Sequence, residues 1–133
     1  MKIQVNFWNG KESLEYEATS MREAIERAVA EDVNLSHVDL SGQRLRGCNF
    51  SDGHFPHADF SDSILDGADF TAANIRYADF RCASLLGADF RFSDMKNAQV
   101  KYAKHDRKKL KGCNGHSLFR ISTELNQPQG EVK

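Results

Sequence analysis

Residues 64–80 read ILDGADFTAANIRYADF, and in this stretch a large apolar side chain returns at every fifth position. These side chains belong to Leu65, Phe70, Ile75 and Phe80. Helices and strands bring residues to one face at periods of 3.6 and 2, so neither element explains the spacing. A different backbone path must place these side chains in a common interior.

The five-residue spacing continues without a break from Leu35 to Val100. Two residues before most of the large side chains stands a small one, such as Ala58, Ala68 or Ala78, and the residue between them is often Asp or Asn. This pattern predicts two interior positions in each unit of five, with the other three facing solvent. Self-similarity at a fixed period is typical of a repeat solenoid, in which each unit buries its apolar residues by stacking on its neighbours.

The pattern A-[DN]-[LF]-x-x over residues 33–103 resembles that of the pentapeptide-repeat proteins. The resemblance implies an all-β solenoid, a right-handed quadrilateral β-helix in which four pentapeptides form one coil, with about 3.5 to 4 coils in this chain. Three hexapeptides support a coil of twenty residues, because LRGCNF at 45, LDGADF at 65 and LLGADF at 85 recur at that period.

Residues 1–32 predict a β-hairpin and a helix that cap the solenoid. The dipeptide at 9–10, Asn-Gly, favours a two-residue type I′ turn, which sets Val5 opposite Leu14 and Ile3 opposite Tyr16. A helix follows, beginning with a capping box and ending near residue 32. A polar-faced cap is the usual cover for the first coil of a solenoid.

Residues 104–133 have two interpretations, a basic helix or a degraded last coil, followed by a tail. The chain as a whole is one structural unit, because 133 residues with 40% hydrophobic content form a single ordinary domain. We expect a cytoplasmic protein, since the sequence has neither a signal peptide nor an apolar stretch of about 18 residues. Its three cysteines include no C-x-x-C pair, so we predict reduced thiols, no metal and no cofactor.

We predict that the chain is not an enzyme and has no small-molecule substrate. Polar residues such as Asp52, His54 and Ser61 lie near one another in the sequence, but the outside of a convex rod lacks the cleft that a hydrolytic triad needs. Function is therefore expected on the surface.

Residues 49–73 carry five aspartates and no Lys or Arg. The window spans about 6 Å of rod at the strand spacing, and duplex DNA has one charge per ~1.7 Å of axis. The resemblance adds that some pentapeptide-repeat proteins, the gyrase-protecting ones among them, act as DNA mimics. The interpretation is an inhibitor or protector that binds a DNA- or RNA-handling enzyme through Asp52, Asp59, Asp62, Asp66 and Asp69.

Two alternatives stay open beside partial DNA mimicry. One is a scaffold or adaptor that binds a protein through one flat side, with Trp8 as an exposed anchor. The other is nucleic-acid binding through a basic patch. The resemblance separately implies a homodimer joined end to end at the C-terminal coil, which lysines there would oppose unless they met the acidic N-terminal end of another chain. The basic patch consists of Lys101, Lys104, Arg107, Lys108, Lys109 and Lys111.

Overall fold

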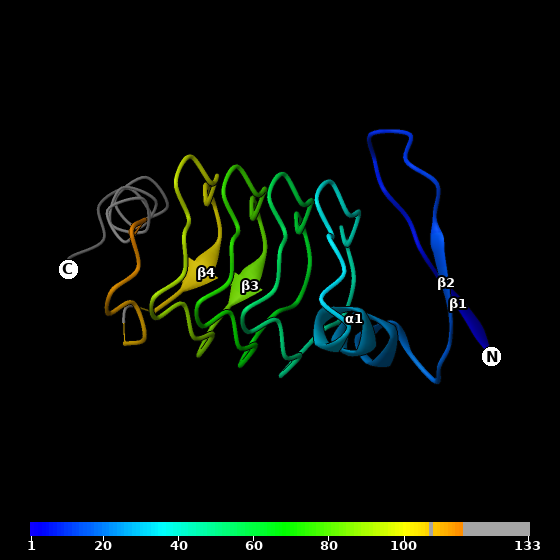
Figure 1. The fold of residues 1–133 in the computed structure, drawn as a ribbon. Helices are drawn as coiled ribbons and strands as arrows, with labels where there is room; N and C mark the ends of the chain where they lie inside the picture. The colour runs from blue at the N-terminus through cyan, green and yellow to red at the C-terminus, as the bar shows by residue number, and fades with distance from the viewer. Residues whose placement is uncertain (107, 116–133) are drawn as a thin grey trace.

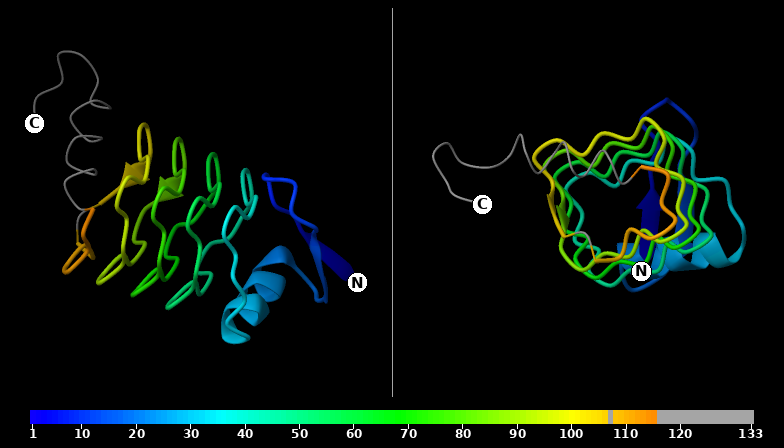
Figure 2. Two further views of the ribbon diagram at one scale, coloured as in Figure 1. Left: turned by 45° about the horizontal axis from the view of Figure 1, so that its top comes forward. Right: turned by 90° about the vertical axis from the view of Figure 1, so that its left-hand side faces the viewer.

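The computed structural model describes residues 1–106 and 108–115 and shows a stack of similar coils with a hairpin and a helix at its N-terminal end (Figure 1). Viewed along the stack, the coils superimpose with a four-sided outline (Figure 2). The predicted C-terminal tail and the basic residue Arg107 lie outside the described residues.

The coil repeats every twenty residues. Parallel bridges join Asp39 to Asp59, Asp59 to Asp79 and Ile64 to Ser84, and this pairing lengthens into two short strands, β3 (Ser84–Leu85) and β4 (Lys104–His105). The fold is thus the predicted quadrilateral β-helix, with the right-handed sense that the resemblance implies. The number of coils and the boundaries at residues 32 and 103 stay predictions.

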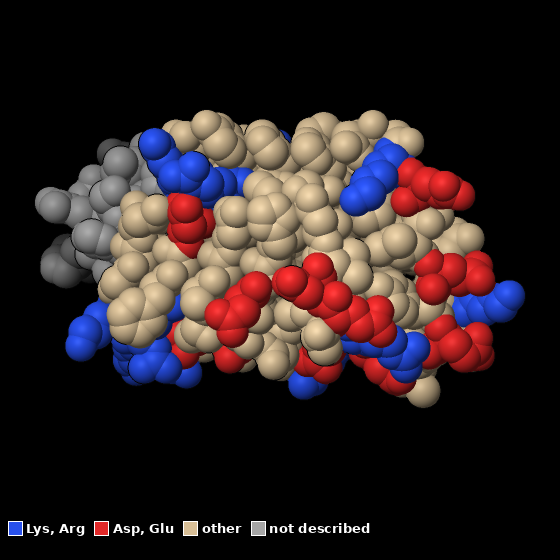
Figure 3. Space-filling view, viewed as in Figure 1, with Lys and Arg blue, Asp and Glu red and all other residues tan. Residues whose placement is uncertain are grey.

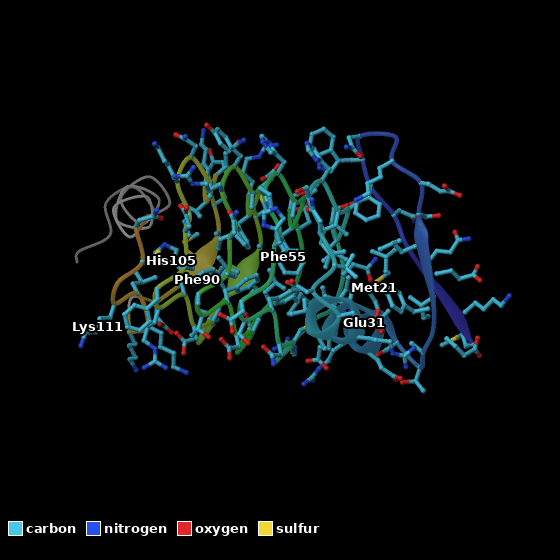
Figure 4. All side chains as sticks on the ribbon, in the orientation of Figure 1. Met21, Glu31, Phe55, Phe90, His105 and Lys111 are labelled. Atoms are coloured by element: carbon cyan, nitrogen blue, oxygen red, sulfur yellow. The ribbon has the colours of Figure 1, made fainter. Side chains whose placement is uncertain are left out.

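Stacked phenylalanine rings fill the interior. The ring centroids of Phe50 and Phe70 lie 4.5 Å apart, and those of Phe70 and Phe90 lie 5.0 Å apart, with interplanar angles of 5° and 4°. Phe60 and Phe80 form a second stack at 4.9 Å, and its rings meet those of the first edge to face. All five side chains are at most 2% exposed, including Phe90, which lies inside the coils in Figure 4. The five-residue spacing therefore marks the core, as predicted.

The N-terminal hairpin pairs in the predicted register but turns differently. Strands β1 (Lys2–Val5) and β2 (Leu14–Glu17) are antiparallel, with Val5 opposite Leu14. The type I′ turn is wrong, because it needs a positive φ at both central residues and only Gly10 has one. The chain leaves the hairpin after Val5 since Phe7 pairs with Val38 of the first coil instead.

Helix α1 (Met21–Ala30) begins at the predicted capping box. The Ser20 hydroxyl accepts a hydrogen bond from the Glu23 amide, and Glu23 in turn accepts from the amide and hydroxyl of Thr19. Glu31 caps the C-terminal end, close to the predicted limit. Ala24 and Ile25 are fully buried, so this face of the helix contributes to the core.

The cap supplies hydrogen bonds that a preceding coil would otherwise make. The Asn49 amide donates to the Glu26 carboxylate at 2.8 Å, and the Arg46 carbonyl accepts from Arg22 at 3.2 Å. In later coils the corresponding amide of Asp69 bonds a backbone carbonyl one coil earlier. Since buried backbone groups left unpaired are costly, these contacts terminate the solenoid.

Trp8 fastens the hairpin to the first two coils. Its indole N–H donates to the His57 carbonyl at 2.8 Å, and its ring meets His37 edge to face at 4.8 Å. The ring of His37 stacks on His57 at 4.9 Å, which stacks on Tyr77 at 4.8 Å. Trp8 is therefore held in place, although 53% of it stays exposed.

At the C-terminal end, the described residues follow the path of a coil. The amides of Phe90 and Phe92 donate to the carbonyls of Lys109 and Lys111, as between earlier coils. Asp106 replaces one backbone acceptor, because its carboxylate accepts from the Gly87 amide at 3.1 Å. Among residues 104–106 and 108–115 the structure has no helix, which favours the degraded-coil interpretation of this part.

The first prediction tests the interior. Phe70→Asp should abolish folding, because an unpaired charge would enter a core that has no room for water. Phe70→Leu is the control, since Leu occupies equivalent interior positions at Leu45 and Leu65, and it should retain the fold with a lower melting temperature. Circular dichroism measures both; a cooperative wild-type melt of Phe70→Asp would refute the assignment of the core.

The second prediction concerns the histidine stack. Burial lowers the pKa of His37, and the neighbouring His57 and Lys11 lower it further. The folded state thus binds the proton less readily than the unfolded chain, so stability should fall as the pH drops below about 6.5. His37→Asn should reduce this loss and keep the backbone, because Asn97 holds the same corner conformation three coils away.

Melting temperatures at about pH 7.5 and about pH 5.5 measure the effect. His54→Asn is the control, since His54 lies outside the ring stack and Asn34 and Asn74 occupy its position in neighbouring coils. An equal fall in melting temperature for His37→Asn and the wild type would show that the stack does not contribute.

Candidate partner-binding surface

The five aspartates of the 49–73 window are spread around the coil. Asp59 and Asp69 are ten residues apart, which is half of a twenty-residue coil, so they lie on opposite sides. Asp52 and Asp62 stand at opposite corners for the same reason, with φ of 59° and 60°. Asp66 lies on a third side. The structure does not gather these carboxylates on one face.

Two of these aspartates stabilise the backbone turns. Asp59 Oδ1 accepts from the amide and the hydroxyl of Ser61, at 2.9 and 2.6 Å, and Asp69 does the same with Thr71. Both aspartates are half-buried. Asn49 has the same role with Ser51, which shows that the turn needs the oxygen and not the charge.

The Asp66 carboxylate is occupied by contacts with neighbouring side chains and backbone. It forms an ion pair with Arg46 at 3.1 Å, one coil earlier, and accepts from the Ser84 hydroxyl and the Leu86 amide. The contacts offset the charge of Asp66 locally. Asp52 and Asp62 are more exposed and make no side-chain hydrogen bond within the described residues.

Later coils carry ion pairs on their surface. Arg81 pairs with Asp79 at 2.7 Å and Arg91 pairs with Asp89 at 2.6 Å. Hydrogen bonds from Arg91 lower the pKa of Asp89 despite its burial. Pairs of this kind contribute about 0 to 1 kcal/mol each because solvent screens them. Acidic and basic side chains are accordingly interleaved on the face in Figure 3.

The described lysines of the basic patch surround the last coil. All five are exposed, and basic side chains gather toward the C-terminal end in Figure 3. Lys101 lies 5.1 Å from the centre of the Tyr102 ring, a cation–π contact. Lys101 and Lys111 are ten residues apart, so they face different sides. These lysines are Lys101, Lys104, Lys108, Lys109 and Lys111.

A groove beside the cap combines aromatic and acidic side chains. Trp8 forms one part of its lining, and pairs of residues one coil apart form the rest. The sequence analysis assigned Trp8 and Asp59 to different roles and missed the groove, although the twenty-residue spacing of the other lining residues was a usable signal. We call this site the aromatic–acidic groove, and its lining residues are Trp8, His57, Ala58, Asp59, Tyr77, Asp79, Asn97 and Gln99.

A second groove lies on a neighbouring side and has mixed charge. Asp62 and Asp66 line it together with the cations of Arg46 and Lys104. The exposed side chain of Leu86 also contributes to this lining. With carboxylates and cations interspersed, this groove does not favour a ligand of either sign.

The described residues include few groups that could act as a nucleophile or a metal ligand. Burial raises the pKa of Cys48 to about 12, so its thiol stays protonated. None of Cys48, Cys82 and Cys113 forms a disulfide. Within residues 1–106 and 108–115, no cluster of three or more His, Cys, Asp or Glu could hold a metal. The helix found in the same residues is too short and too polar to cross a membrane.

Solved structures similar to the chain are repeat proteins. HetL from Nostoc sp. strain PCC 7120, titled as involved in heterocyst differentiation regulation, is 24% identical with a TM-score of 0.42, over 65% of this chain and 36% of HetL. Alr5209 from Nostoc PCC 7120 is 21% identical with a TM-score of 0.35, over 77% of this chain and 93% of alr5209.

QnrB1, titled as a plasmid-mediated fluoroquinolone resistance protein, is 28% identical with a TM-score of 0.34, over 58% of this chain and 41% of QnrB1. The aligned part of the chain thus spans well under half of HetL and QnrB1. No curated protein matches the chain.

The sequence matches the profile of the family described as Pentapeptide repeats, in 8 copies. The matches cover residues 26–62, 34–71, 54–91 and 68–104, which together exceed half of the 133 residues. They include the described coils from the first bridge to β4. The chain therefore belongs to the pentapeptide-repeat family.

Proposed function

We propose that this protein is a non-enzymatic protein-binding module that presents side chains to its partner on a rigid solenoid. The observation that carries the proposal is a set of aromatic residues at exposed corners. Tyr77, Phe92 and Tyr102 have φ of 60°, 61° and 63° and are 48%, 66% and 56% exposed.

Such residues do little for the fold. A positive φ strains a residue that has a Cβ by about 1 kcal/mol or more, and exposed rings gain little from burial. The fold itself does not require aromatic residues at these corners, because Ala72 and Cys82 hold corners one coil before Phe92 and Tyr102. Aromatic side chains are enriched at protein interfaces, where burying them stabilises a complex. The corners therefore favour a protein partner.

Partial DNA mimicry is the second candidate. It is favoured by the aspartates at 39, 59 and 79, which stack one coil apart, and by the absence of Lys and Arg from residues 49–73. If the protein is a partial DNA mimic, its partner is a DNA- or RNA-handling enzyme in the cytoplasm. The use of Asp59 and Asp69 in turns and the ion pair of Asp66 with Arg46 leave fewer carboxylates available to a partner, which makes it the weaker of the two. A homodimer stays a prediction.

The third prediction tests the aromatic corners. A tagged chain should capture a partner from a bacterial lysate, and the triple variant Tyr77→Ser, Phe92→Ser, Tyr102→Ser should lose at least about 90% of it. The melting temperature should fall only slightly, because the replaced rings are about half exposed or more and Tyr77 loses its stacking on His57. Quantitative mass spectrometry after cross-linking measures the capture.

The matched control for this experiment is Ala72→Ser with Cys82→Ser. These substitutions alter two of the same corners one coil away and leave the aromatic residues in place. The control should capture the partner as the wild type does. If the triple aromatic variant also retained its partner, the corners would not be the binding surface.

The fourth prediction separates DNA mimicry from other protein binding. If the acidic window imitates DNA, duplex DNA should displace the captured partner. In that case Asp59→Asn, Asp62→Asn and Asp66→Asn together should weaken binding at least about tenfold at low salt and less at high salt, where screening already reduces the attraction. Titration by calorimetry at two ionic strengths measures this.

Glu12→Gln, Glu15→Gln and Glu31→Gln together form the control, since they remove the same charge from exposed positions of the cap. Under mimicry this control should bind within about twofold of the wild type. Wild-type affinity of the triple asparagine variant at low salt would exclude mimicry and leave the protein-binding module standing.

A further inference from the structure

We infer that the aromatic–acidic groove binds an arginine side chain on an extended segment of a partner protein. The inference rests on the proposed function, because it states what kind of partner the module takes. The lining contains two carboxylates and no Lys or Arg. The charge of the groove thus selects a cation.

Asp59 supplies the net negative charge. Its Oδ1 serves the turn at Ser61, whereas its Oδ2 accepts no hydrogen bond from the described residues. Asp79 is already neutralised, because Arg81 donates to both of its oxygens at 2.7 to 3.2 Å. Arg81 makes no hydrogen bond to Asp59. Asp59, Asp79 and Arg81 together leave one net negative charge, and Arg81 lies close enough to Asp59 to attract it without a hydrogen bond. One guanidinium matches that net charge and forms stronger hydrogen bonds to carboxylates than neutral donors do.

The aromatic part of the lining suits the stem of an arginine. Trp8 and Tyr77 are 53% and 48% exposed, yet both are fixed, Trp8 by its bond to the His57 carbonyl and Tyr77 by stacking on His57. The methylene stem of arginine packs on apolar rings while its charged head reaches a polar partner. Since the rings are already ordered, binding need not immobilise them.

The far end of the groove offers hydrogen-bonding groups to the main chain of a partner segment. Asn97 and Gln99 are exposed and line the groove on the coil beyond Tyr77 and Asp79. A side-chain amide both donates and accepts hydrogen bonds, as a peptide group requires. An extended segment can therefore place its arginine over Asp59 and its main chain along these amides. The groove of mixed charge offers no such selection.

The test uses the full chain and a defined probe, the peptide acetyl-Gly-Ser-Arg-Ser-Gly-amide. Trp8 is the single tryptophan, so its fluorescence reports on this groove alone. We expect a saturable change below about 20 mM peptide. The same peptide with citrulline in place of arginine should bind at least about fivefold more weakly, because citrulline keeps the shape and removes the charge.

Asp59→Asn should weaken binding of the arginine peptide at least about fivefold. Asp69→Asn is the matched control. The two aspartates have the same turn role in the same coil, but Asp69 lies outside the groove. Asn is compatible with either turn, since Asn34 and Asn49 already fill it. Tyr77→Ser should also weaken binding of the peptide. Melting curves verify that each variant is folded.

The inference is overturned by any of three results: no saturable change, equal binding of the citrulline peptide, or an Asp59→Asn variant that binds like the wild type. These results leave the proposed function separately testable. A captured partner that is lost by the triple aromatic variant and kept by Asp59→Asn would retain the protein-binding module and reject the arginine site.

Discussion

The rest of this structure depends on the hydrogen-bond register that pairs each residue with the one twenty positions later. The bridge between Asp39 and Asp59 consists of two such bonds: the Leu40 amide donates to the Asp59 carbonyl at 2.8 Å, and the Asp59 amide donates to the Val38 carbonyl at 2.9 Å. Because every coil is held in the same register, interior side chains stack on equivalent side chains and outward residues form straight rows. The distance between two surface residues is therefore set by their position within the coil more than by their separation in sequence.

The same register explains why residue type alone is a poor guide to surface function. Asp59, an outward residue in a stretch without basic residues, has one oxygen bonded to Ser61 and the other open to a ligand. Asp79, one coil later, has the same turn role, but Arg81 occupies both of its oxygens. Two neighbouring members of one row of aspartates thus differ, one available and one neutralised, and only the contacts distinguish them.

The sequence predicted the repeated features and the local elements of the cap, and it missed contacts between distant segments. The five-residue spacing identified the interior and the coil because each unit provides the same evidence again. The hairpin register was also correct, with Val5 opposite Leu14, but its turn was wrong since the pairing of Phe7 with Val38 joins distant segments. Counting charges along residues 49–73 treated the window as a line, whereas the coil wraps it around the rod. The predicted acidic surface remains untested as a binding site.

The aromatic–acidic groove lies where the cap meets the coils, and the shape of the fold gives a reason. A solenoid of equal coils is convex at its corners, so a hollow with walls of different chemistry is easiest to form where a second element stands beside it. Trp8 comes from that second element and contacts His37 and His57 of the first two coils. The contacts that anchor the cap thus also build one wall of the groove. Substitution of Trp8 would then alter binding without altering the core, because Trp8 takes no part in the phenylalanine stacks.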